Sequence, residues 1–167
     1  ESLLIDAVGN ISGTTASNLS SNTLGVDAVR LTAGGDITLT GGTRSERDID
    51  LTGVNITVGT VTASDTGVGV LNIVATGAVD IDTVTTGGGN ANITGTTVDV
   101  DNMTLARQLM INATDDVTLG TVTAGNVVDI DSDADVTFTS ITTTNESLLI
   151  DAVGNISGTT ASNLSSN

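Results

Sequence analysis

Apolar residues in this chain alternate with Thr, Asp, Asn and Ser in short runs that recur along its whole length. Each run opens with an apolar residue, which in all but one run follows a polar residue. The opening residues are Ile11, Ile37, Ile56, Val79, Val98, Val117, Val136 and Ile156, with successive spacings of 26, 19, 23, 19, 19, 19 and 20 residues. One short unit therefore repeats throughout the chain.

Each short unit carries three apolar patches. In the unit that opens at Val79, Ile73 precedes the opening residue by six positions, Ile81 follows it by two and Val84 follows it by five. Alternation with a period of two residues is typical of strands with one buried face. Gly, Asn and Asp between the patches are typical turn residues. The pattern predicts three short strands per unit.

A unit this small cannot bury its own apolar face, so neighbouring units must stack on it. Stacked strands in register form a parallel β-helix, a β-solenoid with one coil per unit. The variable coil length disagrees with a strict six-residue period, which favours right-handed winding. We therefore predict an all-β fold, a right-handed parallel β-helix with three short strands per coil.

A longer repeat lies above the short one. The 22 residues from Glu1 to Asn22 return unchanged as Glu146 to Asn167, an offset of 145 residues. Two such long copies without a difference are typical of a tandem array. We interpret residues 1–145 as one full repeat of about seven coils, and residues 146–167 as the start of the next identical repeat, continuous with the same solenoid.

Composition indicates how the core is built. The chain has 20 Gly, one Phe and no Trp, Tyr or Pro, so its core must consist of thin layers of Val, Ile and Leu. We expect Ile5, Ile73, Ile111 and Ile130 to be buried in one continuous column.

Charge and missing residue types exclude several classes of function. The net charge of −16 leaves no basic surface for nucleic acid or an anionic membrane, and no apolar run is long enough for membrane insertion. The chain lacks His, Cys and Lys, which removes the usual nucleophile–base pairs, the phosphate-loop Lys and the zinc ligands. We expect that the protein is not an enzyme. A carboxylate pair of a polysaccharide-cleaving β-helix is the alternative, which a recently duplicated array disfavours.

Carboxylates are the one chemical group in supply. Asp80 and Asp82 precede Asp99 and Asp101 by 19 residues, so we expect Asp80 to lie over Asp99 and Asp82 over Asp101 on one outer face. Ca²⁺ prefers several oxygen ligands. The alternative is a solvated acidic face that binds no ion. The predicted metal ligands are Asp80, Asp82, Asp99, Asp101, Asp116 and Asp135.

Asn or Asp precedes most of the opening residues. Such a column can form a ladder of side-chain hydrogen bonds along a stack, and in it Asp116 is expected to stack on Asp135. A second acidic group is expected around these two positions, with Asp115, Asp129, Asp131 and Asp133. The column residues are Asn10, Asp36, Asn55, Asp116 and Asp135.

Irregular coils are candidate recognition loops, because loops on a rigid scaffold often carry binding residues. The enlarged segments are 19–28 and 63–70, and a third irregularity spans Arg44 to Asp48. For the Arg44 segment the alternative is a solvated corner with local ion pairs.

Threonine triplets form another repeated feature. They occur at Thr60 to Thr62, Thr83 to Thr85 and Thr121 to Thr123, and they resemble the flat threonine array of ice-binding β-helices. The alternative is that Thr is simply a favourable strand residue.

Two segments, GGDITLTGG from Gly34 to Gly42 and TGAVDIDTVTTGG from Thr76 to Gly88, resemble the filamentous haemagglutinin-like repeats of large bacterial surface adhesins. The resemblance implies a right-handed β-helix in an extracellular or cell-surface fibre, without catalytic residues. We therefore expect a structural segment of an extracellular fibre or adhesin stalk that contacts surfaces or biofilm matrix. Its expected partners are further copies of itself, end to end and laterally. The alternative is a carbohydrate- or receptor-binding adhesin module that uses the enlarged coils.

Overall fold

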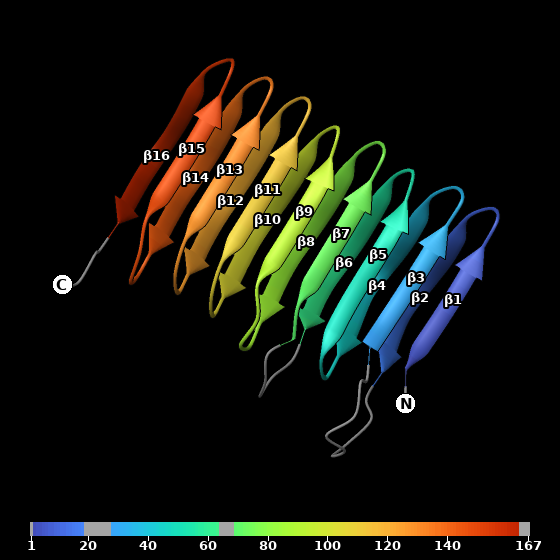
Figure 1. Ribbon diagram of the computed structural model, residues 1–167. Helices are drawn as coiled ribbons and strands as arrows, with labels where there is room; N and C mark the ends of the chain where they lie inside the picture. Colours follow the sequence, from blue (N-terminus) through green and yellow to red (C-terminus); the bar gives the residue numbers. More distant parts are fainter. Residues whose placement is uncertain (1, 19–27, 64–68, 164–167) are drawn as a thin grey trace.

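The computed structural model describes residues 2–18, 28–63 and 69–163, and these form two parallel β-sheets wound into a solenoid (Figure 1). The described part is all-β, which confirms the predicted β-solenoid. It contains no helix long and apolar enough to cross a bilayer. Successive strands alternate between the two sheets, so the chain moves one strand position along each sheet per coil.

The described residues place eight strands in each sheet. Sheet A contains, in spatial order, β1 (Leu3–Ala7), β3 (Ala28–Ala33), β5 (Asp48–Gly53), β7 (Leu71–Ala75), β9 (Ala91–Gly95), β11 (Leu109–Ala113), β13 (Val128–Ser132) and β15 (Leu148–Ala152). Sheet B contains β2 (Ile11–Asn18), β4 (Ile37–Ser45), β6 (Ile56–Ala63), β8 (Val79–Thr86), β10 (Val98–Leu105), β12 (Val117–Ala124), β14 (Val136–Thr143) and β16 (Ile156–Asn163).

The three predicted apolar patches are distributed over these two sheets. The first patch forms the sheet A strand, as Ile73 does in β7, and the other two lie in one longer sheet B strand. In β8 the buried residues Ile81 and Val84 are separated by two residues rather than one, so the alternation changes phase within the strand. The sheet B strands therefore present two runs of outward side chains, one on each side of this phase change.

The core is a stack of aliphatic columns between the sheets. The Ile73 and Ile130 side chains are fully buried and Ile111 is nearly so, as predicted. The prediction was wrong for Ile5, whose side chain is 38% exposed. Ile5 pairs with Leu31 of β3, but in the described residues β1 has no strand on its other side. A column residue becomes fully buried only when a coil covers it on both sides.

One coil departs from the regular pattern. The register shifts between Leu39 and Thr43 of β4 relative to β6, which marks a β-bulge with one extra residue on β4. Gly42 in this bulge has a φ of 109°, and a Cβ there would collide with the Thr60 backbone. Glycine adopts this left-handed conformation without a steric penalty, so it accommodates the extra residue.

Candidate functional site

The outer face of sheet B brings together the predicted acidic residues. Asp80 of β8 and Asp99 of β10 are paired in register, as predicted from their 19-residue spacing. Asp82 and Asp101 lie at the position of the phase change, between the pair Ile81–Val100 and the next pair of the ladder. All four carboxylates are exposed, and they form what we call the acidic face.

Burial and neighbouring charge both act on the Asp99 carboxyl of the acidic face. Partial burial raises the pKa of the Asp99 carboxyl above its ordinary value, and the negative charges of Asp80 and Asp101 raise it further. Both causes disfavour the ionised form. A proton or a cation at Asp99 would relieve both effects.

The carboxylates of the acidic face are neighbours without forming a coordination cage. Among the described residues, no group of three or more acidic side chains is placed to hold one metal ion. A hard cation such as Ca²⁺ takes six to eight oxygen ligands. Calcium binding here would need waters or a second molecule to complete the shell, and it stays a prediction.

Asp116 and Asp135 have a structural task in this fold. The Asp135 backbone N–H donates to Asp116 Oδ1 at 3.1 Å, and the Asn155 backbone N–H donates to Asp135 Oδ1 at 2.7 Å. The Asn155 side-chain amide donates to the same Asp135 oxygen at 3.3 Å. Each carboxylate thus links its own coil to the next one.

The same linkage recurs at the N-terminal end of this column of Asn and Asp residues. We call the whole hydrogen-bonded column the corner ladder. Asn10 Oδ1 accepts the Asp36 N–H at 2.9 Å, Asp36 Oδ1 accepts the Asn55 N–H at 3.1 Å, and Asn55 Oδ1 accepts the Ala78 N–H at 3.0 Å. The predicted column is hydrogen-bonded from coil to coil, mainly from a backbone N–H to a side-chain oxygen, and Asn55 and Asn155 add the predicted side-chain amide bonds. It is interrupted where Ala78 and Thr97 stand in the column, and there the Asp116 N–H turns to the neighbouring Asp115 side chain.

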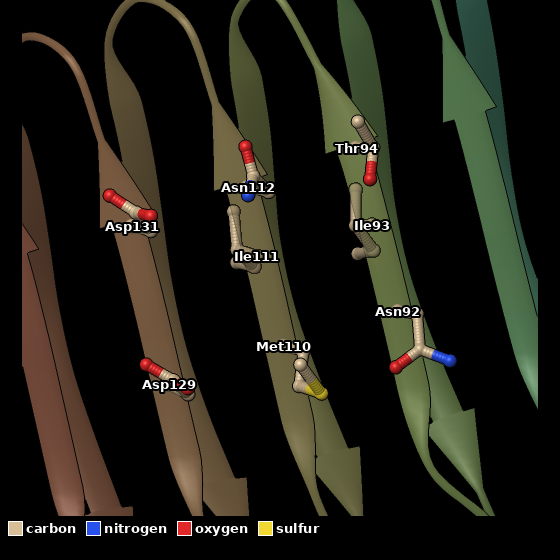
Figure 2. A pocket seen from close by; sticks show the side chains of 8 residues that line it. All are labelled: Asn92, Ile93, Thr94, Met110, Ile111, Asn112, Asp129 and Asp131. Atoms are coloured by element: carbon tan, nitrogen blue, oxygen red, sulfur yellow. The ribbon is translucent and has the colours of Figure 1, made fainter.

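The second acidic group predicted around Asp116 and Asp135 is divided by the fold. Asp129 and Asp131 belong to β13 and project from the outer face of sheet A (Figure 2). Asp116 and Asp135 precede sheet B strands and lie in the corner ladder. Residues within a strand, such as Asp129 and Asp131, project from a face of the sheet, whereas residues in a turn, such as Asp135, lie at a corner. Acidic residues that are close in sequence are therefore separated in the fold.

A shallow depression of about 400 Å³ lies on the outer face of sheet A over β9, β11 and β13. Figure 2 shows Asn92, Met110 and Asp129 in one row across the three strands. A second row contains Thr94, Asn112 and Asp131, with the backbone of Ile93 and Ile111 between the rows. Five of the eight lining residues are polar, two of them acidic, and the exposed Met110 side chain adds apolar surface.

Sequence reasoning missed a second ladder that leads to this depression. The Arg30 guanidinium contacts Asp50 Oδ2 at 3.2 Å, the Asn72 amide donates to Asp50 Oδ1 at 2.9 Å, and the Asn92 amide donates to Asn72 Oδ1 at 2.8 Å. The ladder ends at Met110, which pairs in register with Asn92 on the next strand. A signal was present, because each of these residues directly precedes a buried Leu or Ile of the sheet A column.

Threonine side chains, with one Asn and one Ser among them, form two in-register columns on sheet B. Thr62, Thr85, Thr104, Thr123 and Thr142 follow one another on successive strands. The parallel column contains Thr60, Thr83, Asn102, Thr121 and Ser140, so one amide interrupts the hydroxyl groups. The threonine triplets predicted from the sequence are thus aligned, beside the charged acidic face.

Most of the two enlarged coils, residues 19–27 and 64–68, lies outside the described residues. The Arg44 segment is described. Arg44 Nη2 lies 3.9 Å from Glu46 Oε1, and the Arg47 N–H donates to Ser45 Oγ at 3.2 Å. These local contacts fit the alternative of a solvated corner.

Comparison with protein-family models, with curated proteins and with solved structures finds no match to this chain.

Proposed function

We propose that the chain is a structural repeat segment of an extracellular fibre or adhesin stalk, which provides length, stiffness and surface contact. One observation carries the proposal. The duplicated segment pairs in register with its neighbour in both copies, β1 with β3 and β15 with β13. A further copy of the repeat can therefore extend both sheets without a change of register.

The fold supports this role through its continuous interactions. The aliphatic core and the in-register strand ladders run from one end of the described residues to the other, and the corner ladder adds side-chain links. Each coil contacts only its neighbours, so length grows with copy number while local stability stays constant. The resemblance to haemagglutinin-like repeats agrees with an extracellular or cell-surface location.

The finer architecture belongs to the same proposal. We infer right-handed winding and about seven coils per 145-residue repeat, each built from three short apolar segments. The offset of 145 residues moves the chain by seven strand positions, from β1 to β15. At about 4.8 Å per strand position, one repeat adds roughly 34 Å of length.

Rod length tests the stalk. A chain with one additional 145-residue copy should form a rod about 34 Å longer, measured by small-angle scattering or negative-stain microscopy. An unchanged longest dimension would contradict the proposal. Antibody labelling of intact source cells tests the location, since labelling only after lysis would exclude a surface fibre.

The runner-up function is a carbohydrate- or receptor-binding adhesin module. The depression on sheet A favours it, because amide and carboxylate side chains line one shallow site there. Binding to a glycan panel tests this function with Asn112→Ala in the depression, against Thr118→Ala on the other sheet as a matched control. Loss of binding only in the Asn112 variant would favour a ligand-specific module over a plain stalk.

A further inference from the structure

The hydrogen-bonded ladder on the outer face of sheet A has a fixed direction. A carboxylate oxygen only accepts hydrogen bonds, so Asn72 must donate its amide to Asp50 Oδ1, which it does at 2.9 Å. The Asn72 oxygen is then left to accept, and it takes the Asn92 amide at 2.8 Å. The Asn92 oxygen therefore lies on the other side of its side chain, toward the next strand of the sheet.

That next strand supplies no donor for the Asn92 oxygen. Met110 of β11 pairs in register with Asn92, and its thioether carries no N–H or O–H group. Figure 2 shows the Asn92 oxygen turned toward Met110 and the Asn92 nitrogen turned away from it. Elsewhere in the ladder an amide N–H fills this position, so an N–H group of a ligand can fill it here.

The far side of the depression carries negative charge. Asp129 follows Met110 in register on β13, and Asp131 lies two residues further along the same strand. Among the described residues, the ion pairs involve Arg30 and Arg44, and neither Asp129 nor Asp131 takes part in one. A positively charged ligand would therefore meet two carboxylates that no described cation neutralises.

The separation of these acceptors does not suit a single metal ion. Asn92 and Asp129 lie two strands apart, which corresponds to roughly 10 Å between their backbones. Ca²⁺ holds its oxygen ligands at about 2.3–2.6 Å, and no acidic group in the described part of the chain is arranged to hold a metal. The arrangement fits an extended ligand with a donor group at each end.

Met110 indicates what kind of segment joins those two ends. Its side chain is 49% exposed and stands between Asn92 and Asp129 in the row across the depression (Figure 2). Apolar ligand surface that covers this side chain would be removed from water, which is favourable. The thioether chain is also flexible enough to adapt its shape to a ligand. Across the three strands the order is an uncharged acceptor, an apolar surface and a carboxylate.

We propose that the depression binds a linear aliphatic diamine or polyamine. One ammonium group of the ligand contacts Asp129 and Asp131, the methylene chain covers Met110, and a nitrogen at the other end donates to the Asn92 oxygen. Hydrogen bonds between charged groups are stronger than neutral ones. The proposal goes beyond the stalk function and does not depend on it. It also assigns the depression a ligand class other than the glycan or receptor of the runner-up function.

The Met residues provide the measurement. The chain contains only Met103 and Met110, so a sample with isotope-labelled Met methyl groups gives one NMR signal from each. Met103 is 2% exposed in the core and serves as an internal reference, whereas Met110 reports on the depression. Titration with putrescine at constant ionic strength should shift the Met110 signal along a saturable curve and leave the Met103 signal in place.

Ligand variants test the contact at both ends. Butylamine keeps one ammonium group and the carbon chain but lacks the second nitrogen, so it should bind severalfold more weakly than putrescine. Butanediol keeps the length without the charge and should bind more weakly still. If butylamine or Ca²⁺ shifts the Met110 signal as strongly as putrescine does at equal ionic strength, the proposal is overturned.

A pair of charge variants separates a site from diffuse attraction to the net charge of −16. Asp129→Asn removes a carboxylate from the depression, whereas Asp80→Asn removes the same charge from the acidic face of sheet B. Asp129→Asn should weaken putrescine binding severalfold, and Asp80→Asn should leave it nearly unchanged. Equal losses in the two variants would overturn the proposal, and an unmoved Met103 signal shows that each variant keeps its core.

The contact with the Asn92 oxygen is tested by extending the ladder. Met110→Asn places an amide beside Asn92 that occupies this oxygen, so putrescine binding, followed here by calorimetry, should weaken severalfold. Met110→Leu keeps both the apolar surface and the open oxygen and should bind as the native chain does. Equal binding by the two variants would overturn the proposed contact. Rod length enters none of these measurements, so the stalk function stands or fails separately.

Discussion

The Phe138 ring fills the space left by the missing side chain of Gly158. The two residues are paired in register between β14 and β16, and a Cβ on Gly158 would collide with the ring carbons. Phe138 is the only aromatic residue of the chain. Its ring packs against the first coil of the next repeat, so the largest core side chain lies at the repeat boundary.

We expect Gly158→Ala to destabilise the packing of β14 against β16. The added methyl group overpacks a filled site, which typically costs about 1–3 kcal/mol. Hydrogen exchange of the β16 amides measures this cost, since exchange should accelerate there and stay unchanged in β6. The matched control is Gly13→Ala, where a Cβ would lie 3.7 Å from Leu39 Cδ2 in ordinary contact. Equal effects of the two substitutions would contradict the packing at the boundary.

The acidic face gives a pH-dependent stability. The raised pKa of Asp99 means that the folded protein holds this proton more tightly than the unfolded chain does. The contribution of Asp99 to the free energy of unfolding is therefore lost as the pH rises from the ordinary carboxyl pKa through the raised one. Above that window the ionised Asp99 destabilises the fold.

Asp99→Asn should accordingly raise the free energy of unfolding at pH 7, and the gain should disappear in acid, where the native carboxyl is protonated. Denaturant curves at several pH values measure it. Thr118→Asn serves as a control, because it changes the same column without changing the charge. A gain for Asp99→Asn that persists at low pH would show that charge is not the cause.

Calcium binding at the acidic face has its own test. Millimolar Ca²⁺ should raise the melting temperature of the native chain more than Na⁺ at equal ionic strength, because an ion that binds only the folded form stabilises it. Replacing Asp80 and Asp99 together with Asn should remove the difference while the fold is kept. Identical melting curves in Ca²⁺ and Na⁺ for the native chain would leave a solvated acidic face.

Removing a member of the corner ladder should lower the stability of the protein, and adding a member where the ladder is interrupted should raise it. Asn55→Ala removes the acceptor of the Ala78 N–H and the amide that donates to Asp36 at 2.9 Å. A lost hydrogen bond typically costs about 0.5–1.5 kcal/mol, so thermal stability should fall. Conversely, Ala78→Asn places an acceptor where the ladder is interrupted, next to Thr97, and should raise stability. If Ala78→Asn is as destabilising as Asn55→Ala, the ladder does not contribute in this way.

Several features of the fold and the candidate site could be predicted from the sequence. The 19-residue spacing that separates Asp80 from Asp99 also separates their buried neighbours Ile81 and Val100, so alternation and coil length together specified the register. The corner ladder was visible for the same reason, because Asn10, Asp36 and Asn55 hold one position relative to the buried residue that follows. A period of two residues and a constant coil length are local properties of the chain.

Other features depended on the tertiary structure. The sequence did not separate Asp129 and Asp131 from Asp116 and Asp135, because only the fold decides which residues project from a sheet face and which lie at a corner. Likewise, alternation marked Ile5 as a core residue, yet its exposure depends on whether a coil covers it from the other side.

Residues 1–22 and 146–167 have the same sequence, but the described strands of the two copies have different neighbours. Sequence alone determined that this segment forms a coil with Ile11 or Ile156 facing inward. The tertiary structure decided that Ile11, paired with β4, is almost buried while Ile156, paired with β14, is half exposed. It also decided that Gly158 but not Gly13 receives the Phe138 ring. The physical reason is that burial and packing belong to pairs of adjacent coils, whereas the apolar pattern belongs to one coil at a time.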